Sequence, residues 1–220
     1  MEALSSRGIV TFGTATCVRE ATLLADAGVD AILAQGAEAG GHRGSFAANG
    51  AEALVPTLRL VSEIRGAVSL PVIATGGIMD GRDIRAALDA GAVAAQFGTA
   101  FLCCPESGAS PAYKASLMAG RQTVLTRAFS GRWARGLPNE FTAAAEQLAN
   151  AILPYPLQNQ LTRPMRQAAA VKGDAGLLSL WAGQGVSSIR SMPAADLVRL
   201  LASELAAAPH GGPQPRTLDT

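Results

Sequence analysis

The chain has 220 residues, of which 49% are hydrophobic, 5% aromatic and 16% charged, and its formal net charge is +1. This length is enough for one domain with a substantial core. The balanced charge, with no basic face, excludes a nucleic-acid-binding protein. No apolar stretch is long enough to cross a bilayer, so we expect no membrane association.

The chain shows no sign of secretion or of a metal centre. Its beginning lacks the apolar run after basic residues that marks a signal peptide. The three cysteines, Cys17, Cys103 and Cys104, have no metal-ligand spacing. We therefore expect a reduced, cytoplasmic protein without a metal site, in which the cysteines are structural.

The first hundred residues predict short strands that alternate with helices. Apolar runs predict strands at 9–12, 29–34, 71–74 and 93–97. Helices are expected from a cap at Thr14 or Thr16 to Gly28, from about 52 to 65, and from 80 to 90. This alternation predicts right-handed β-α-β units and a parallel sheet buried on both faces, in the α/β class. Four such units are half of the eight that a (β/α)₈ TIM barrel contains.

The pattern changes after Pro105. Helices are expected over 107–126, 141–153, 161–171 and 194–208, with a Gly- and Arg-rich loop over 129–139. We therefore expect three parts. Residues 1–105 form half of a barrel with a phosphate site, 106–208 form a mostly helical segment that completes the same domain, and 209–220 form a disordered tail.

Two glycine-containing motifs follow the third and fourth predicted strands. They are Ala74-Thr75-Gly76-Gly77-Ile78 and Gln96-Phe97-Gly98-Thr99-Ala100. Glycine lets a backbone approach a ligand closely, and the N–H groups at a following helix start attract phosphate. One such turn is also an ordinary strand-to-helix connection, but two on consecutive strands favour a phosphate site. The pattern does not distinguish FMN from a sugar phosphate.

A glycine-rich loop contains the histidine that we expect to be catalytic. The loop runs from Gln35 to about Asn49 and has four glycines between Gly36 and Gly44, with His42 among them. Only one other histidine, His210, is present, and it lies in the predicted tail. Histidine titrates near neutrality, and the end of a barrel strand is where barrel active sites lie. A general base is therefore favoured over a surface histidine.

Several other polar residues have simpler interpretations. Glu38 is expected to hydrogen-bond within the loop, to orient a neighbouring residue, or to be a solvated carboxylate. Asp80 and Asp83 are expected to cap a helix. The arginine-containing stretches at 130–132 and 135–136 could reach an anionic ligand, but surface ion pairing is the simpler account.

In the order and spacing of its motifs, the chain resembles the nitronate monooxygenase (2-nitropropane dioxygenase) family. The resemblance covers about residues 8–206. Its motifs are Gly28–Ile32, Gln35-Gly36, Glu38–His42, Pro71–Ala74, Gly76–Ile78, Gln96–Phe101, Phe129–Arg132, Leu153–Pro156 and Trp181–Gly185. The histidine loop is also similar to that of the flavin-dependent enoyl-[acyl-carrier-protein] reductases, so this loop alone does not separate the two families.

The resemblance implies a non-covalently bound FMN. Its phosphate is expected against Gly76, Gly77, Gly98 and Thr99, with Gln35 and Gly40 near the ring. Thr75 and Gln96 are also expected to bind the cofactor. The implied reaction oxidises alkyl nitronates or nitroalkanes with O₂ to carbonyl compounds and nitrite. His42 matches the family's catalytic base, and the redox chemistry belongs to the cofactor.

The resemblance also implies that the chain holds the second half of the barrel and the C-terminal segment. A fragment is favoured over two copies that complete one another, although a homo-oligomer stays open. Three alternatives remain: an enoyl-[acyl-carrier-protein] reductase, an inactive half-barrel that only binds partners or flavin, and a purine-nucleotide dehydrogenase. The last needs a Gly-Ser-x-Cys motif, which Cys103-Cys104 does not match.

Overall fold

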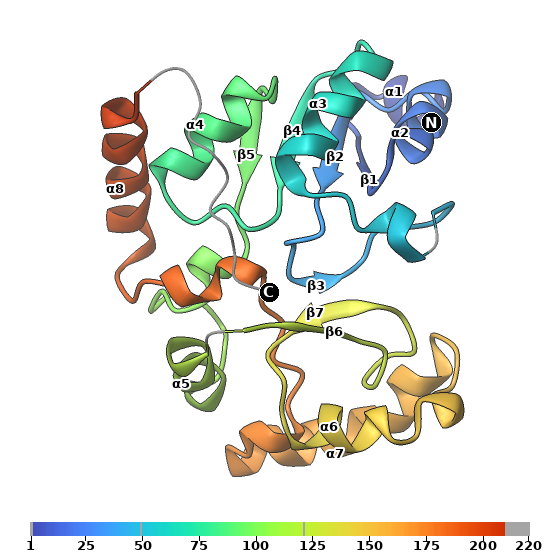
Figure 1. Cartoon of the computed structure of the whole chain (residues 1–220), viewed down its shortest axis with the longest axis vertical. Coiled ribbons are helices and arrows are strands. Elements are labelled where there is room, and N and C mark those ends of the chain that lie inside the picture. Colours follow the sequence, from blue (N-terminus) through green and yellow to red (C-terminus); the bar gives the residue numbers. More distant parts are fainter. Residues whose placement is uncertain (1, 49, 121, 210–220) are drawn as a thin grey trace. The chain divides into compact units, whose positions relative to one another are not determined.

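The computed structural model describes residues 2–48, 50–120 and 122–209 (Figure 1). The chain divides into two compact units. The first unit contains the residues up to 39, residues 44–97, and the residues from 198 on. The second unit contains residues 40–43 and 98–197. The expected boundary at 105/106 differs from this division, and our prediction that 106–208 completes one domain stays a prediction.

A four-stranded parallel sheet forms the centre of the first unit. Its order is β1-β2-β4-β5, with β1 Phe12–Ala15, β2 Ala31–Gln35, β4 Val72–Thr75 and β5 Ala94–Gln96. The helices between these strands are α2 (Val18–Asp26), α3 (Thr57–Ala67) and α4 (Gly81–Asp89), which pack against β1, β4 and β5 respectively (Figure 1). Two short elements, α1 (Glu2–Ser5) and the 3₁₀ helix η1 (Gly50–Ala53), complete this part. The predicted α/β class with a parallel sheet is confirmed.

Small and aliphatic side chains fill the core of the first unit, as the composition predicts. Ile32, Leu60, Val61, Ile64 and Val72 are fully buried. The first strand begins at Phe12 rather than at residue 9. Because Ile9 and Val10 are exposed and the N–H of Thr11 binds the side chain of Asp30, this stretch does not continue the strand.

The helix starts of the first unit test two expected caps. Asp80 caps α4, and Asp83 reciprocates in a capping box, as predicted. The cap expected for α2 at Thr14 or Thr16 is wrong, because Cys17 occupies the N-cap position without a side-chain bond. The Thr16 hydroxyl instead donates to Glu20. The third helix also begins later than expected, at Thr57, after η1.

The second unit combines a small antiparallel sheet with helices. Its sheet order is β3-β7-β6, with β3 Gly41–His42, β7 Ala134–Gly136 and β6 Val124–Thr126. The helices are α5 (Pro111–Ala119), α6 (Glu140–Glu146) and α7 (Leu157–Lys172), with 3₁₀ turns η2 (Thr99–Phe101), η3 (Ala149–Ala151), η4 (Ala175–Leu177) and η5 (Gln184–Ser188). Helix α8 (Ala194–Ala207) belongs to the second unit up to Leu197 and to the first unit from Val198 on.

Two helix predictions for the second unit are wrong. The helix expected over 107–126 begins at Pro111, after the Ser110 cap, and ends before Gly120, and residues 124–126 form strand β6. The helix expected over 141–153 ends at Glu146. The loop expected over 129–139 contains β7, which pairs with β3, the strand that contains His42. The tail residues 210–220, including His210, lie outside the described residues.

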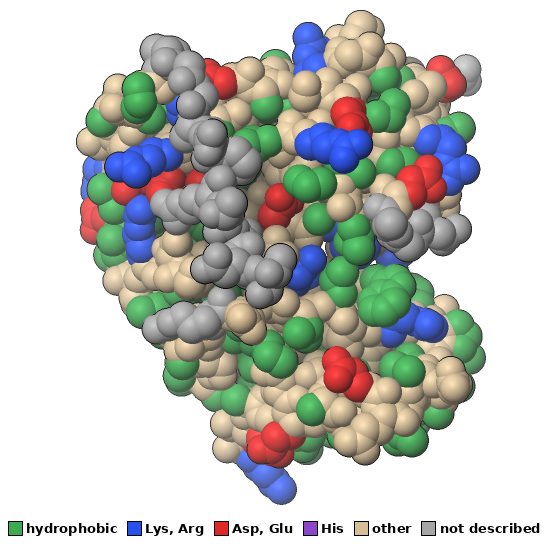
Figure 2. All heavy atoms as spheres, viewed as in Figure 1, with side chains coloured by type: hydrophobic (Ala, Val, Ile, Leu, Met, Phe, Trp, Pro, Cys, Tyr) green, Lys and Arg blue, Asp and Glu red, His purple; other side chains and the backbone are tan. Residues whose placement is uncertain are grey.

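Figure 2 shows basic and acidic side chains interspersed over the visible surface of each unit. In the part of the chain that the structure describes, no helix is long and apolar enough to cross a membrane.

Candidate active site

Two glycines determine where His42 lies. A Cβ at Gly40 would lie 2.5 Å from the backbone of Ala182 and of Gly183, so only glycine fits there. The next residue, Gly41, has φ +76°, a conformation that side chains disfavour. This sharp path brings His42 opposite Ala134 in the β3–β7 pairing. The loop glycines therefore place the predicted base on a short strand instead of a free loop.

His42 contacts a serine and a tryptophan. Its Nε2 lies 2.8 Å from the Oγ of Ser130. Its ring meets the indole of Trp181 edge-on, with centroids 5.3 Å apart and planes at 62°. The residue remains exposed to solvent. The imidazole is thus held on two sides and is still accessible to a small molecule.

The surroundings of His42 favour the neutral imidazole. Partial burial lowers the pKa of His42 below its ordinary value of 6.5, and the positive charges of Arg132 and Arg166 lower it further. The lowered pKa favours the uncharged imidazole, which keeps a lone pair. A neutral imidazole beside two fixed positive charges can remove a proton from a carbon acid and stabilise the resulting anion.

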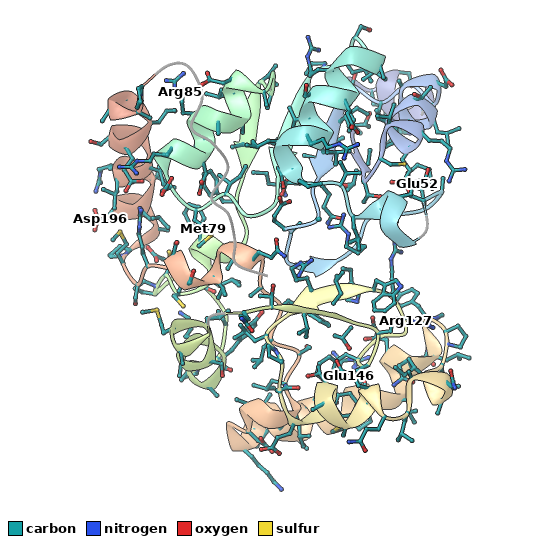
Figure 3. All side chains as sticks on the ribbon, in the orientation of Figure 1. Glu52, Met79, Arg85, Arg127, Glu146 and Asp196 are labelled. Carbon is teal, nitrogen blue, oxygen red and sulfur yellow. The ribbon has the colours of Figure 1, made fainter. Side chains whose placement is uncertain are left out.

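The loop that carries Ser130 is fixed by hydrogen bonds to its carbonyl groups. Gln158 and Thr162, both buried on α7, donate to the carbonyls of Ala128 and Phe129 at 2.7 and 2.6 Å. Arg127, on the loop that follows β6 (Figure 3), donates to the Gly131 carbonyl at 3.1 Å. Ser130 itself is only 2% exposed. The serine is therefore buried and held in place by the hydrogen bonds of its loop, whereas surface ion pairing of the neighbouring arginines stays a prediction.

Aromatic packing fixes Trp181. The indole packs edge-on against Phe129 at 5.6 Å, and Phe129 contacts Phe141 at 4.9 Å. The Trp181 backbone bridges to Gly136 of β7 and accepts a hydrogen bond from the Tyr113 hydroxyl. Sequence reasoning did not assign Ser130 or Trp181 to the site, because both are distant in the chain from His42.

Three predicted cofactor residues lie side by side at the carboxyl end of the parallel sheet. Gln35, Thr75 and Gln96 are the last residues of β2, β4 and β5 and stand in register with one another. The Oε1 of Gln35 also accepts the N–H of Gly44 at 2.7 Å. This edge is where ligands bind in parallel α/β proteins.

The Gly76-Gly77 turn packs tightly inside the first unit. Gly76 has φ +126°, and a Cβ added to it would lie 2.9 Å from the Oγ1 of Thr57. Gly77 has φ +72°, and a Cβ added to it would lie 2.9 Å from the Cβ of Glu38. Internal packing alone accounts for both glycines. Contact of this turn with phosphate is an additional role, which we treat as a proposal.

Glu38 stabilises the start of α3. Its Oε2 accepts the N–H of Thr57 at 2.9 Å and the Thr57 hydroxyl at 2.6 Å. A carboxylate at a helix N-terminus is favourable for the helix dipole. Glu38 is therefore not a solvated carboxylate, and its observed partner is Thr57 on α3 rather than a residue within the loop.

The N-terminus of α4 is filled by the protein's own carboxylates. Asp83 accepts the N–H groups of Met79 (Figure 3) and Asp80, and Asp80 accepts those of Arg82 and Asp83. The N–H of Gly81 binds Glu204 at 3.0 Å. A phosphate cannot use this helix end, which corrects the reason given for the first phosphate motif.

The N–H groups just before α4 remain available. Within residues 2–48, 50–120 and 122–209, the structure shows no protein acceptor for the N–H groups of Gly76, Gly77 and Ile78. The same holds, over the same ranges, for Gly98 and Thr99 of the second unit. A Cβ at Gly98 would meet open space. Each unit thus presents one turn with unused backbone donors.

Thr99 and Gly40 meet at one backbone group of the second unit. The Gly183 N–H donates to the Oγ1 of Thr99 at 2.8 Å, and a Cβ at Gly40 would lie 2.5 Å from the same nitrogen. The Thr99 hydroxyl accepts this bond and keeps its own proton for donation. The segment after Trp181 therefore links two predicted cofactor residues.

Comparison with known proteins decides the family. A family model for nitronate monooxygenase matches residues 1–204. The chain is 47% identical over 208 residues to the nitronate monooxygenase of Pseudomonas aeruginosa, covering 93% of this chain and 59% of that protein. It is 44% identical over 188 residues to a probable nitronate monooxygenase of Bacillus subtilis, covering 84% and 54%. This chain belongs to the nitronate monooxygenase family.

Solved structures agree with this assignment. Nitroalkane oxidase from Streptomyces ansochromogenes matches with a TM-score of 0.88 at 47% identity, over 93% of this chain and 59% of that one. FabK from Thermotoga maritima matches with a TM-score of 0.79 at 31% identity, over 94% and 64%. Both neighbours are TIM-barrel enzymes, so the predicted fold family is confirmed.

The nitronate monooxygenase family is flavin-dependent. The chain spans about 59% of the length of the curated Pseudomonas relative that it matches. The cofactor's identity, the substrate and the reaction of this chain are therefore proposals.

Proposed function

We propose that the chain acts as an FMN-dependent nitronate monooxygenase, which oxidises alkyl nitronates and nitroalkanes with O₂ to carbonyl compounds and nitrite. The observation that carries the proposal is the position of His42, whose imidazole contacts Ser130 and Trp181 and whose pKa is lowered by burial and by Arg132 and Arg166. Membership of the nitronate monooxygenase family supports the reaction type.

The residues present fit the phosphate of FMN. Gly76, Gly77 and Ile78 in the first unit present unused N–H groups, and so do Gly98 and Thr99 in the second unit. In each unit, taken by itself, these are the donors that a phosphate requires. The Thr99 hydroxyl adds a further donor. We propose that Thr75 and Gln96, the last residues of β4 and β5, contact the cofactor, and that Gln35 and Gly40 lie near the flavin ring.

His42 would remove the α-proton of a neutral nitroalkane. The C–H bond breaks, an N–H bond forms on the imidazole, and the electron pair passes into the nitronate. The positive charges of Arg132 and Arg166, which lower the His42 pKa, would also stabilise the negatively charged nitronate. When bound, FMN supplies the electron-transfer chemistry with the substrate and O₂.

The second candidate is a flavin-dependent enoyl-[acyl-carrier-protein] reductase. The FabK structure gives it support, but at lower identity and TM-score than the nitroalkane oxidase structure. Reduction of bound flavin by NAD(P)H with turnover of a crotonyl thioester would establish the reductase and overturn the monooxygenase.

We also propose a reducing cytoplasmic setting and structural cysteines. Cys17, Cys103 and Cys104 are free and buried, and burial raises the pKa of Cys103 and of Cys104. A homo-oligomer remains part of the proposal, and analytical ultracentrifugation of the purified chain tests it.

The experiment that tests the proposed function is an absorbance spectrum followed by an assay. The purified chain is mixed with excess FMN, desalted and supplied with ethyl nitronate in air. Retained flavin absorbance and nitrite release are expected. Flavin retention without nitrite, or loss of all flavin on desalting, would contradict the proposal.

A further inference from the structure

The hydroxyl of Ser130 has three polar neighbours. These are the Nε2 of His42 at 2.8 Å, the carbonyl oxygen of Arg132 at 3.2 Å and the N–H of Arg132 at 3.3 Å. A serine hydroxyl offers one proton and two lone pairs. The Arg132 N–H can only donate, and the Arg132 carbonyl can only accept. The Ser130 proton therefore goes to the carbonyl, and its second lone pair is left for His42.

This count leaves one arrangement in which all three contacts are hydrogen bonds. The imidazole must donate Nε2–H to the serine oxygen. We infer that Ser130 selects the Nε2–H tautomer of His42, so that Nδ1 carries the lone pair and is the atom that takes up a proton. Ser130 is thus a positioning residue that acts through His42.

The rigidity of the Ser130 loop makes this selection effective. The carbonyls of Ala128 and Phe129 are bound by α7, and Ser130 is 2% exposed, so the hydroxyl cannot turn toward water. A side chain held in this way can favour one tautomer of its neighbour, as second partners of a histidine do in other sites.

The arrangement needs no change when His42 is protonated. In the imidazolium, Nε2–H still donates to Ser130, and only Nδ1 gains a proton. The charges that lower the pKa of the ring are those of Arg132 on the serine loop and Arg166 on α7. Since both are positive, the serine oxygen is an acceptor that partly compensates the imidazolium.

The role of Nδ1 as the base rests on the proposed function, but the tautomer does not. The chain has two histidines, so a His210→Gln variant leaves His42 as the only imidazole. With ¹⁵N-labelled histidine, NMR reports which ring nitrogen carries the proton, without FMN or turnover. Above the His42 pKa, we expect a protonated Nε2 and an unprotonated Nδ1, with the Nε2 proton protected from exchange with water.

Ser130→Ala in the same background tests the cause. We expect a mixture of tautomers, a fast-exchanging Nε2 proton and about a tenfold loss of proton affinity, seen as a lower His42 pKa. Ser130→Thr keeps the hydroxyl and should restore the wild-type spectrum. Ser116→Ala removes a hydroxyl that binds the Ala112 carbonyl elsewhere in the second unit, and should change nothing at His42.

Two results would overturn the inference. One is a wild-type spectrum with the proton on Nδ1, which would make the serine a donor to Nε2. The other is a Ser130→Ala variant with unchanged tautomer, exchange rate and pKa. Because the wild-type tautomer is measured first, a poorly folded variant does not remove the test. An absence of nitrite release would contradict only the proposed reaction.

Discussion

The backbone N–H and the hydroxyl of Thr16 both donate to one carboxylate oxygen of Glu20, each at 2.7 Å. The other oxygen accepts three consecutive N–H groups, from Phe46, Ala47 and Ala48, at 2.6, 2.8 and 3.0 Å. Glu20 is fully buried. One carboxylate therefore holds the last part of the histidine loop to the start of α2.

This pairing predicts acid-sensitive stability. Burial raises the pKa of Glu20, but the hydrogen bonds from Ala47, Thr16 and Ala48 outweigh it and lower the pKa from 4.5 to about 2. Because the folded pKa lies below the unfolded one, the stabilisation is complete above pH 4.5 and is lost as the pH falls toward 2. Urea unfolding at pH 7 and pH 3 measures it.

The Glu20→Gln variant should lose about 2–3 kcal/mol of unfolding free energy at pH 7 and show less acid sensitivity. Glu52→Gln is the matched control, because Glu52 is a half-exposed carboxylate that pairs with Arg19 at 3.4 Å. We expect less than about 1 kcal/mol from it. Equal losses in the two variants would show that Glu20 has no special role.

A second prediction separates crowding from backbone strain at Gly77. Gly77→Ala places a Cβ 2.9 Å from that of Glu38 at φ +72°, whereas Gly173→Ala meets nothing within 4 Å at φ +67°. Strain alone costs about 1 kcal/mol, and the clash adds about 1–3 kcal/mol. Thermal unfolding should therefore show the larger loss for Gly77→Ala.

The same pair tests the phosphate turn. Gly77→Ala should also weaken FMN retention on desalting, by about tenfold, since the turn must shift. Gly173→Ala, at the end of α7, should retain FMN as the wild type does. Unchanged FMN affinity in Gly77→Ala would remove Gly77 from the proposed phosphate site.

A third prediction concerns the charge beside His42. Burial and the charge of Arg132 lower the His42 pKa most, and Arg166 lowers it further, so Arg166→Met should raise the pKa. Histidine NMR titration measures the change, and the acidic limb of the kcat/KM profile should move to higher pH with it. Arg163→Met, an exposed neighbour on α7, is the control. A fall of the pKa in Arg166→Met would contradict the electrostatic account.

The sequence predicted the parts of the fold that depend on local patterns. Apolar runs ended by Gly and Asp placed the parallel strands, and Asp80 with Asp83 marked the start of α4. Local patterns failed where the pairing is distant. Residues 124–126 form a strand rather than the expected helix because they pair with β7. Strand β7 also pairs with β3, which contains His42.

The candidate site shows the same limit. The glycines of the histidine loop pointed to His42, but Ser130 is 88 residues away in the chain and no local signal links the two. The sequence predicted an α4 N-terminus open to phosphate. In the structure the N–H of Gly81 there donates to Glu204, which lies 123 residues away in the chain, and no local pattern indicates this contact. Both are tertiary contacts without a periodic signature.

The central claim is that His42 is the base of a nitroalkane-oxidising site, and one comparison tests it most directly. Oxygen consumption by the FMN-loaded chain and its His42→Ala variant is measured with neutral nitroethane and with preformed ethyl nitronate. We predict that the variant loses activity at least about a hundredfold with nitroethane and far less with ethyl nitronate, which needs no base. Equal losses with both substrates, or no loss with nitroethane, would contradict the claim.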